Sequence, residues 1–522
     1  MLARVQSAVV VGVDAIPVEV EIDLANGLPA FACVGLLQSA VKEGRERVTA
    51  AIGNSGYQLP LKRITANLAP ADLPKAGSAF DLPIAIGVLL ASGQIAVRPS
   101  APNPGFFFGE LSLEGGLRPV RGALAMVLCA RERGAKWAII PFDNLAEAAL
   151  VDGIAVLGAR SLREVADHLE GRRPIAESPA PALVADPEPL VDFADVRGQA
   201  VAKRALEVAA AGGHNVVMIG PPGGGKTMLA RRLATILPPL TPLEILEVAK
   251  IHGVAGLLAS GRLSGARPFR SPHHTVSDAG LVGGGAYPRP GEVSLAHHGV
   301  LFLDELAEFR RHVLEALRQP LEDGMVTIAR ASLTLSYPAR FMLVAAMNPC
   351  PCGFLGDPRR ECRCRSGEVA KYRGRVSGPL MDRIDLQLAV PGTSWQDMGD
   401  DSPQESSAAV RARVSEARSR QLVRYRASPG VFANAHLSSR DVRRWCNPDA
   451  SGRALLGKAA ERFGISARGY ARILKLARTI ADLEGEERLA AHHVGEAIQY
   501  RQLDRAPSEP GLRSAGSGSP PG

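Results

Sequence analysis

The sequence predicts an α/β nucleotide-binding core that follows an α+β region and precedes a helical one. Near residue 220, a glycine-rich segment lies between an apolar run and an amphipathic stretch, as in a phosphate-binding strand–loop–helix unit. Residues 1–170 alternate short apolar runs with stretches of helical period, whereas residues 409–505 are mostly of helical period. These observations favour several domains, in agreement with a length of 522 residues.

The composition is that of an ordinary globular protein. Hydrophobic residues make up 46% and charged residues 22%, and the net charge of +8 mildly indicates an anionic partner. No apolar run approaches the length of a membrane span, and the first residues lack the layout of a signal peptide. We therefore expect a cytoplasmic protein without membrane contact. Seven cysteines, four of them clustered, argue against a disulfide framework.

Residues 1–170 are predicted to form a domain with its own core. Residues 18–24 alternate apolar and acidic side chains, as in a half-buried strand. Further elements are predicted as strands over residues 64–68, 106–113 and 137–141 and as helices over residues 38–52 and 81–91. Five prolines among Ala, Glu and Ser mark residues 171–192 as a linker, and residues 506–522, rich in Gly, Ser and Pro, are predicted to be a disordered tail.

The segment Gly220-Pro-Pro-Gly-Gly-Gly-Lys226-Thr227 fits the phosphate-binding template G-x-x-x-x-G-K-[ST]. It follows a buried-strand pattern over residues 216–219 and precedes a helical pattern over residues 228–237, which is the context that the motif requires. Glycines let backbone N–H groups surround phosphate oxygens, and the helix N-terminus adds its positive dipole end. Lys226 is predicted to reach the β- and γ-phosphates, and Thr227 to offer its hydroxyl to Mg²⁺.

A second apolar run ends in two acids, Asp304 and Glu305. At a strand end beside the phosphate loop, Asp304 is predicted to bind Mg²⁺ with Thr227, and Glu305 to act as the general base toward the attacking water. The alternative is that both acids only cap a helix over residues 306–317. The predicted ATP-binding residues are Gly220, Pro221, Pro222, Gly223, Gly224, Gly225, Lys226, Thr227, Met228 and Asp304.

Three further segments carry a resemblance to a known family: FRSPHH at residues 269–274, GEVSLAHHGVLFLDE at 291–305 and NPCPCG at 348–353. With the phosphate loop, they resemble the YifB/ComM family of magnesium-chelatase-like AAA+ proteins, over residues 1–505. The resemblance implies an AAA+ ATPase core over residues 193–395, a helical lid over residues 396–505, and a hexameric helicase for branch migration of DNA in natural transformation. It also assigns Asn348 as the sensor that holds water against the γ-phosphate, and residues 196–199 as the segment beside the adenine.

The resemblance assigns roles to two arginines as well. Arg383 in GPLMDRIDL resembles the arginine finger, which stabilises the transition state at a neighbouring subunit's nucleotide. An ion pair of Arg383 with Asp382 or Asp385 is the alternative. Arg468, in a helix with Ser466 as its predicted N-cap, resembles the sensor that contacts the γ-phosphate in its own subunit.

The first domain resembles the proteolytic domain of the Lon family, which works through a Ser–Lys dyad. The matching stretches are GELSLEGGLRPVR at residues 109–121, AIIP at 138–141 and Asn144. The nucleophile position falls on Ala79, one residue after Ser78, and Arg118 or Arg121 holds the lysine position. Arginine stays protonated and cannot activate a serine, so we predict a domain that is Lon-like in fold and inactive as a protease. A dyad of Ser78 with Lys75 is the alternative, and scaffolding, assembly or DNA contact is the expected use.

Four cysteines lie close together as two C-x-C pairs. They predict a structural Zn²⁺ site, with unliganded thiols or a redox pair as alternatives, and are Cys350, Cys352, Cys362 and Cys364. The pairs His273-His274 and His297-His298 are predicted to pack in loops or to contact DNA. Adjacent side chains point apart on a strand, so we do not expect either pair to share a metal.

The density of basic residues in the helical region suggests DNA. Six arginines and one acid lie within residues 411–426, and ten basic residues and three acids within residues 440–478. Such density suits phosphate contact, with a solvated lid surface as the alternative. Two segments are predicted pore loops: the glycine-rich residues 252–285, and a hairpin over residues 321–337 that turns at Asp323-Gly324 and carries Arg330.

The sequence therefore predicts an ATP-driven homo-oligomeric motor on single-stranded or branched DNA, with ATP, Mg²⁺ and structural Zn²⁺ as bound groups. A chelatase-like or protein-remodelling ATPase without DNA translocation is the first alternative. A regulatory ATP switch is the second.

Overall fold

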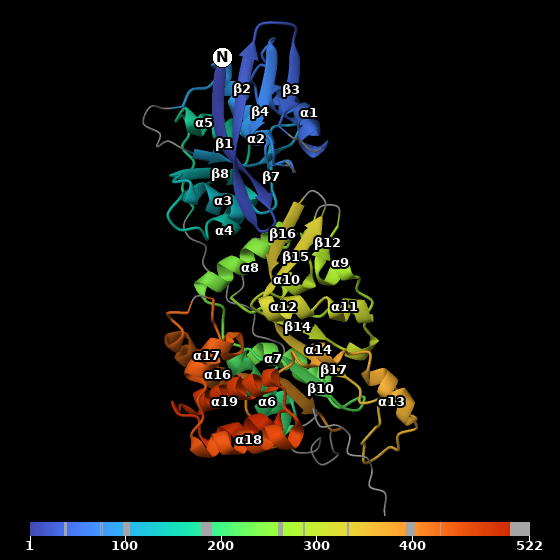
Figure 1. Ribbon diagram of the computed structural model, residues 1–522. Coiled ribbons are helices and arrows are strands. Elements are labelled where there is room, and N and C mark those ends of the chain that lie inside the picture. Colours follow the sequence, from blue (N-terminus) through green and yellow to red (C-terminus); the bar gives the residue numbers. More distant parts are fainter. Residues whose placement is uncertain are drawn as a thin grey trace, which may run out of the picture.

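The computed structural model describes residues 1–35, 39–73, 75, 77–97, 105–178, 191–258, 265–285, 288–330, 333–392, 402–428 and 430–501. Two α/β bodies lie one above the other, and a group of C-terminal helices packs against the lower body (Figure 1). We name residues 1–178 the front region, residues 191–392 the core and residues 402–501 the lid. The mixed α/β class predicted from the sequence is confirmed.

The front region is built on a seven-stranded mixed sheet in the order β3-β4-β2-β1-β5-β8-β9. Its strands are β1 (Leu2–Val11), β2 (Asp14–Ala25), β3 (Ala30–Val34), β4 (Arg63–Ala69), β5 (Gly105–Phe107), β8 (Trp137–Pro141) and β9 (Ala155–Ala159). In β2, Val18, Val20, Ile22 and Leu24 are buried while the acidic residues between them are more exposed. This alternation is the pattern that predicted the strand.

Helices cover both faces of this sheet. Helices α1 (Ser39–Asn54), α2 (Asp81–Ala91) and α5 (Leu162–Leu169) share one hydrophobic cluster with it. Helices α3 (Ala123–Glu132) and α4 (Leu145–Ala148) share a second cluster, and a small hairpin is formed by β6 (Glu110–Leu111) and β7 (Leu117–Arg118). The front region is thus a sandwich of helices, sheet and helices.

The core contains a five-stranded parallel sheet in the order β11-β14-β17-β10-β18. Its strands are β10 (Val216–Ile219), β11 (Phe269–Arg270), β14 (Val300–Leu303), β17 (Met342–Met347) and β18 (Leu386–Ala389). Strands β14 and β17 are buried along their whole length, which explains their unbroken apolar sequences. Helices α6 (Ala200–Gly212), α7 (Lys226–Ile236) and α8 (Pro242–Ala255) belong to the same body. Since all strands run in one direction, their carboxyl ends meet at one edge of the sheet.

Insertions separate the later strands of the core. The strand elements are β12 (Gly283–Gly284), β13 (Arg289–Pro290), β15 (Met325–Arg330) and β16 (Leu333–Pro338), and the helices are α9 (Asp278–Leu281), α10 (Glu292–Leu295), α11 (Arg311–Glu315), α12 (Arg318–Asp323), α13 (Ser366–Arg373) and α14 (Gly378–Met381). The predicted hairpin exists, but its predicted turn is wrong. Gly324 has φ of +66° and ends helix α12, whereas β15 and β16 pair from Met325 with Pro338 as far as Arg330 with Leu333. Glycine is favoured at helix ends as well as in turns, so the Asp-Gly pair fitted both. The side chain of Arg330 lies outside the described residues.

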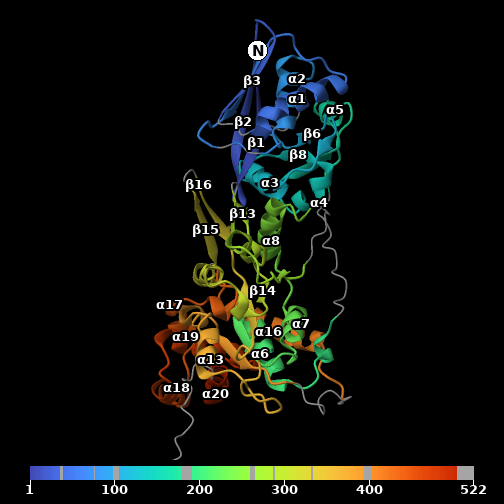
Figure 2. The same cartoon turned by 90° about the vertical axis from the view of Figure 1, so that its right-hand side faces the viewer.

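The front region rests on two elements of the core. Ala249 of α8 packs in the cluster around α3, and the backbone N–H of Gly122 donates to the carbonyl of Gly253 over 3.2 Å. Val13, in the β1–β2 turn, shares a cluster with Leu335 of β16. Figure 2 shows α8 and the β15–β16 hairpin reaching the lower end of the front region.

The lid consists of α16 (Ser407–Arg424), α17 (Ser439–Trp445), α18 (Ala450–Phe463), α19 (Ala467–Glu484) and α20 (Ala491–Gln499). A short 3₁₀ turn of the lid covers Asn434–His436, and others in the front region and the core cover Phe142–Asn144, Phe193–Asp195 and Leu306–Glu308. Ser466 caps α19, as predicted, by accepting a hydrogen bond from the N–H of Gly469. Among the helices that the structure describes, none is long and apolar enough to cross a bilayer.

Several arginines of the dense basic segments are structural rather than free for DNA. Arg418 is buried and donates to the carbonyls of Ala210 and Ala211 over 2.8 and 3.1 Å. Arg424 and Arg478 bind the buried Asp482 carboxylate over 2.5 to 3.1 Å. The sequence count could not show this, because a buried and an exposed arginine look alike in a composition. Exposed basic side chains nevertheless gather on the lid: Arg411, Arg426, Arg440, Arg443, Arg444, Arg453, Lys458, Arg462 and Arg468.

Candidate nucleotide-binding site

The phosphate-binding loop connects β10 to α7. Gly223 and Gly225 have φ of +76° and +82°, a region that side chains with a Cβ rarely adopt. At Gly220, a Cβ would lie 1.9 Å from the carbonyl oxygen of Val390, so no larger residue fits there. Lys226 Nζ donates to the carbonyls of Gly220 and Pro221, each over 2.8 Å. Burial lowers the pKa of Lys226, an effect that the nearby Asp304 opposes.

The predicted residues of the phosphate loop, the acidic strand end and the segment after β17 meet at the carboxyl ends of β10, β14 and β17. Lys226 Nζ lies 3.3 Å from Asn348 Oδ1, which follows β17. The Thr227 hydroxyl donates to Asp304 Oδ2 over 2.7 Å, and Asp304 Oδ1 accepts the N–H of Glu305 over 2.9 Å. The phosphate loop, the acidic strand end and the sensor strand therefore form one connected polar group, which suits a nucleoside triphosphate with its metal ion.

Glu305 differs from its neighbour in both backbone and exposure. Its φ of +52° places a non-glycine residue in the left-handed region, and its side chain is 60% exposed. Strained backbone of this kind concentrates at functional sites. His274, in the turn after β11, brings Nδ1 within 3.5 Å of Glu305 Oε2. Asp304 faces the phosphate loop, whereas the Glu305 carboxylate stays available to water.

Residues 196–199, predicted to lie beside the adenine, approach the loop that follows β18. Gln199 Nε2 donates to the carbonyl of Pro391 over 2.8 Å, and Val196 is fully buried. Because Val390 also contacts Gly220, this segment and the phosphate loop meet the same stretch of chain.

Arg383 and Arg468 lie at the opposite edge of the sheet. They line a cavity of about 510 Å³ together with Asn215, which precedes β10, and Phe341, which precedes β17. Both guanidinium groups contact Glu322 of α12, Arg383 through a very short ion pair and Arg468 over 3.7 Å. A four-residue strand rising about 3.3 Å per residue spans roughly 13 Å, so the length of β10 separates this cavity from the phosphate loop.

This placement differs from the contact predicted for Arg468. Its guanidinium lies beside Arg383 rather than at the phosphate loop of its own subunit. The two acids suggested as partners of Arg383 are also not its partners: the structure pairs its guanidinium with Glu322 and with the carbonyl of Pro379, over 2.6 Å in the latter case.

Comparison with known proteins agrees with these features. Family models described as "Magnesium chelatase, subunit ChlI", "Subunit ChlI of Mg-chelatase" and "Magnesium chelatase, subunit ChlI C-terminal" match residues 192–398, 20–144 and 404–501. The chain is 44% identical over 509 residues to the uncharacterized protein YifB of Salmonella typhimurium, which covers 97% of this chain and 98% of that protein. It is also 44% identical over 511 residues to the competence protein ComM of Haemophilus influenzae, with the same coverage.

The chain belongs to the YifB/ComM family of magnesium-chelatase-like AAA+ proteins. A more distant relative is the magnesium-chelatase 38 kDa subunit of Rhodobacter capsulatus, 26% identical over 360 residues that cover 63% of this chain and 91% of that subunit. The AAA+ assignment accounts for the parallel core sheet and implies the use of ATP and Mg²⁺.

The front region of this YifB/ComM family member gives Ser78 and Lys75 different partners. The Ser78 hydroxyl makes a very short hydrogen bond to Glu110, and Lys75 Nζ makes one to the carbonyl of Pro70. Ala79 is buried, and Arg118 is an exposed partner of Glu110 over 3.7 Å. No described contact joins Ser78 to Lys75, so the structure offers no support for the alternative dyad.

The histidine pairs lie outside strands, as predicted, but the prediction that their side chains point apart is wrong. His298 has φ of +56° and is not extended, so the His297 and His298 rings lie 4.0 Å apart and both contact Glu247, over 3.0 and 2.6 Å. Burial lowers the pKa of His297 to about 4. The His273 and His274 rings are likewise 4.1 Å apart, in a turn rather than a strand.

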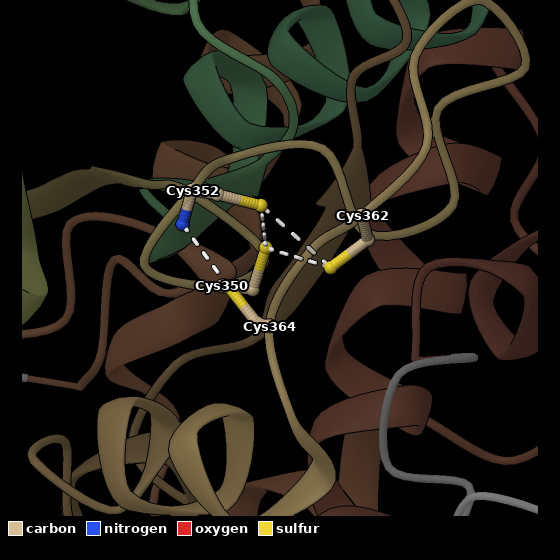
Figure 3. A group of neighbouring side chains, drawn as sticks. All are labelled: Cys350, Cys352, Cys362 and Cys364. Carbon is tan, nitrogen blue, oxygen red and sulfur yellow. Dashed lines mark hydrogen bonds between the residues drawn. The ribbon is translucent and has the colours of Figure 1, made fainter.

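The four cysteines are brought together. Their sulfurs lie within 4.8 Å of one another, in the loop between β17 and α13 (Figure 3). Hydrogen bonds from the backbone N–H groups of Phe354 and Arg363 lower the pKa of Cys352 to about 6.

Sequence reasoning missed two residues of the candidate site. Glu322, the shared partner of Arg383 and Arg468, lies about 60 residues before the first of them, and nothing in its own surroundings marks it. His274 was noted only as part of a pair. Its position one strand away from Glu305 could have been inferred only from the order of the strands.

Proposed function

We propose that this protein is an ATP-hydrolysing ring motor, a branch-migration helicase that acts on single-stranded or branched DNA in natural transformation. The observation that carries the proposal is the division of the site across the sheet. Lys226 and the acids lie at the carboxyl edge, and Arg383 and Arg468 at the amino edge. A subunit cannot apply these arginines to its own nucleotide, but a neighbour in a closed ring can.

The residues divide the chemistry of hydrolysis between them. Lys226 would leave the carbonyls of Gly220 and Pro221 to neutralise phosphate oxygens. Glu305 would take the proton of the attacking water, which Asn348 orients. Thr227 and Asp304 already contact each other and would hold Mg²⁺, which supplies positive charge to the phosphate groups. In this proposal Arg468 acts beside Arg383 on the neighbouring subunit's nucleotide.

Two features support DNA as the substrate. The relative from H. influenzae is named a competence protein, and competence is the state in which bacteria take up DNA. On the lid of this chain, the exposed arginines include Arg440, Arg443 and Arg444 of α17, and the last of these stacks on Trp445 at 4.7 Å. Exposed basic side chains next to aromatic rings suit a nucleic-acid backbone and its bases.

We also propose that the front region has no proteolytic activity and serves assembly or the placement of DNA. Its β1–β2 turn packs on the β15–β16 hairpin, a predicted pore element. A movement of the hairpin would therefore displace the β1–β2 turn of the front region.

The test is the ATPase rate of the full chain with and without forked DNA. We expect stimulation by DNA, and fork unwinding that the Lys226→Ala variant lacks. A rate that DNA leaves unchanged, together with a Glu305→Gln variant that still retains ATP, would instead favour a chelatase-like or remodelling ATPase.

A further inference from the structure

The loop between Asn348 and helix α13 lacks regular secondary structure. Residues 349–365 contain no helix or strand, and their large apolar side chains Phe354 and Leu355 are not buried, Leu355 being 38% exposed. Loops of this length without secondary structure are uncommon in compact domains, and a hydrophobic core does not hold this one. Within this loop the four cysteine sulfurs gather at one place.

The sulfur positions match those of a metal tetrathiolate. Cys350 Sγ lies 3.4 Å from Cys352 Sγ and 3.7 Å from Cys362 Sγ, and the last two sulfurs are 3.7 Å apart. Four thiolates at about 2.3 Å from a tetrahedral Zn²⁺ ion would be about 3.8 Å from one another. The backbone N–H of Cys352 donates to Cys364 Sγ over 3.4 Å, which ties the fourth cysteine to the opposite C-x-C pair.

We propose that Cys350, Cys352, Cys362 and Cys364 bind one Zn²⁺ ion, and that the closed metal loop supports the phosphate-binding loop. Four sulfur ligands leave no open position, which is the arrangement of a structural rather than a catalytic zinc site. A redox pair would need two sulfurs, whereas here four converge on one point (Figure 3).

The contacts of the loop carry the second half of the proposal. Gly353, between the two cysteine pairs, has φ of +84°, and a Cβ on it would lie 2.6 Å from Pro222 Cδ in the phosphate loop. Asn348, which contacts Lys226, precedes the first cysteine by two residues. The metal would therefore hold the backbone of residues 348–353 in place, and with it the contact of Asn348 with Lys226 and that of Gly353 with Pro222. This second half rests on the proposed ATP site, but the metal site itself does not.

Metal analysis of the full chain, purified without a metal-affinity tag, tests the site directly. We expect about one zinc per chain, in keeping with a single tetrathiolate site, and the absorption of a tetrahedral thiolate centre after replacement by Co²⁺. The double variant Cys352→Ser/Cys362→Ser should lose the metal. Its zinc affinity should fall by more than the roughly 10- to 100-fold that is typical when a residue hydrogen-bonded to a metal ligand is replaced. Cys33→Ser, outside the cluster, should keep it.

A wild-type chain that contains no metal and gives no cobalt thiolate spectrum would overturn the proposal, as would a double variant that keeps its zinc. Should the variant fail to fold, the cobalt spectrum of the wild type still decides. Iron in place of zinc would contradict the choice of metal.

The support of the phosphate loop has its own readout. Removing zinc from the wild type with a chelator should weaken binding of a fluorescent ATP analogue, and adding zinc back should restore it. Unchanged binding would overturn the supporting role while leaving the metal site. A chain that binds zinc but never binds the analogue would instead count against the proposed ATPase.

Discussion

At the scale of single residues, Asp304 and Glu305 show how two adjacent acids take different tasks. Asp304 is held by Thr227 and by the backbone of Glu305, so its carboxylate has no freedom to act as a base. Because the backbone of Glu305 is left-handed, the Glu305 side chain lies toward His274 and not toward the group formed by Thr227 and Asp304. A regular extended backbone would send the two side chains to opposite faces of the strand. The strained conformation therefore suits a catalytic carboxylate that stays near the site without binding the metal.

Glu305→Gln should keep ATP binding and lose hydrolysis. Glutamine preserves the size of the side chain but cannot accept the proton of water, so we expect kcat to fall about 10²- to 10⁴-fold. The measurement is the steady-state ATPase rate beside the affinity for a fluorescent ATP analogue. Glu308→Gln, an exposed acid that pairs with Arg375 over 2.8 Å, is the control. A Glu305 variant with wild-type turnover would remove Glu305 from the mechanism.

Glu147 of α4 predicts a pH dependence of stability. Its side chain is 5% exposed, and burial raises its pKa to about 7 against the hydrogen bond from Asn144, which lowers it. A carboxyl with a raised pKa in the folded state stabilises the protein below pH 4.5, and this contribution is lost as the pH rises to about 7. Glu147→Gln should therefore stabilise the front region above pH 7, by up to about 3 kcal/mol.

Thermal unfolding at pH 5 and pH 8 tests this expectation. The wild type should lose more stability between the two values than the Glu147→Gln variant. Asp143→Asn, an exposed acid on the preceding turn, is the matched control. Equal pH dependence in wild type and Glu147→Gln would mean that the carboxyl is not held in its neutral form.

At the scale of elements, the sequence predicted regular units well and their meeting points poorly. The strand over residues 216–219, the helix over 81–91 and the strand over 137–141 have the predicted bounds, because periodicity and burial are local properties. The turn at Asp323-Gly324 failed because a glycine with positive φ ends a helix as readily as it turns a hairpin.

The candidate site shows the same division. The phosphate loop and the two acids could be predicted, since each is one continuous motif beside a strand. The shared contact of Arg383 and Arg468 with Glu322 could not, because it joins three elements that are far apart in the chain. The sequence also could not predict which arginines of the lid are buried.

The attachment of helix α19 to α16 gives a prediction at this scale. Asp482 is fully buried and accepts hydrogen bonds from Arg424, Arg478 and Asn434. Asp482→Ala would leave the buried guanidinium of Arg478 and the partly buried one of Arg424 without their carboxylate, which costs about 3–5 kcal/mol. We expect faster hydrogen exchange across α16 and α19, measured by mass spectrometry. Glu461→Ala on the exposed face of α18 should leave exchange unchanged, and an equally silent Asp482→Ala would show that this network does not hold the lid.

At the scale of the whole molecule, the two edges of the core sheet carry different functional groups. In the proposed motor, the carboxyl edge would bind the nucleotide and would lack only a positive charge from outside the subunit. The amino edge presents two arginines, restrained by Glu322, in a cavity that the core and the lid form together. In a ring, each interface would bring the carboxyl edge of one subunit to the amino edge of its neighbour. Every subunit would then contribute a phosphate loop to one interface and its arginines to another.

Mixing two inactive variants tests this arrangement. Lys226→Ala removes the nucleotide-binding half of an interface and keeps Arg383, whereas Arg383→Ala does the reverse. Each variant alone should have almost no ATPase activity. In an equal mixture, about one interface in four would combine an intact Lys226 with a neighbour's intact Arg383, so activity should reappear at up to that fraction of the wild-type rate. The measurement is the ATPase rate against the ratio of the two variants, with Lys226→Ala/Arg383→Ala mixed with either single variant as the control that cannot complement. If the mixture stays as inactive as its components while wild-type subunits still assemble, Arg383 acts within its own subunit, and the division of the site between neighbours is wrong.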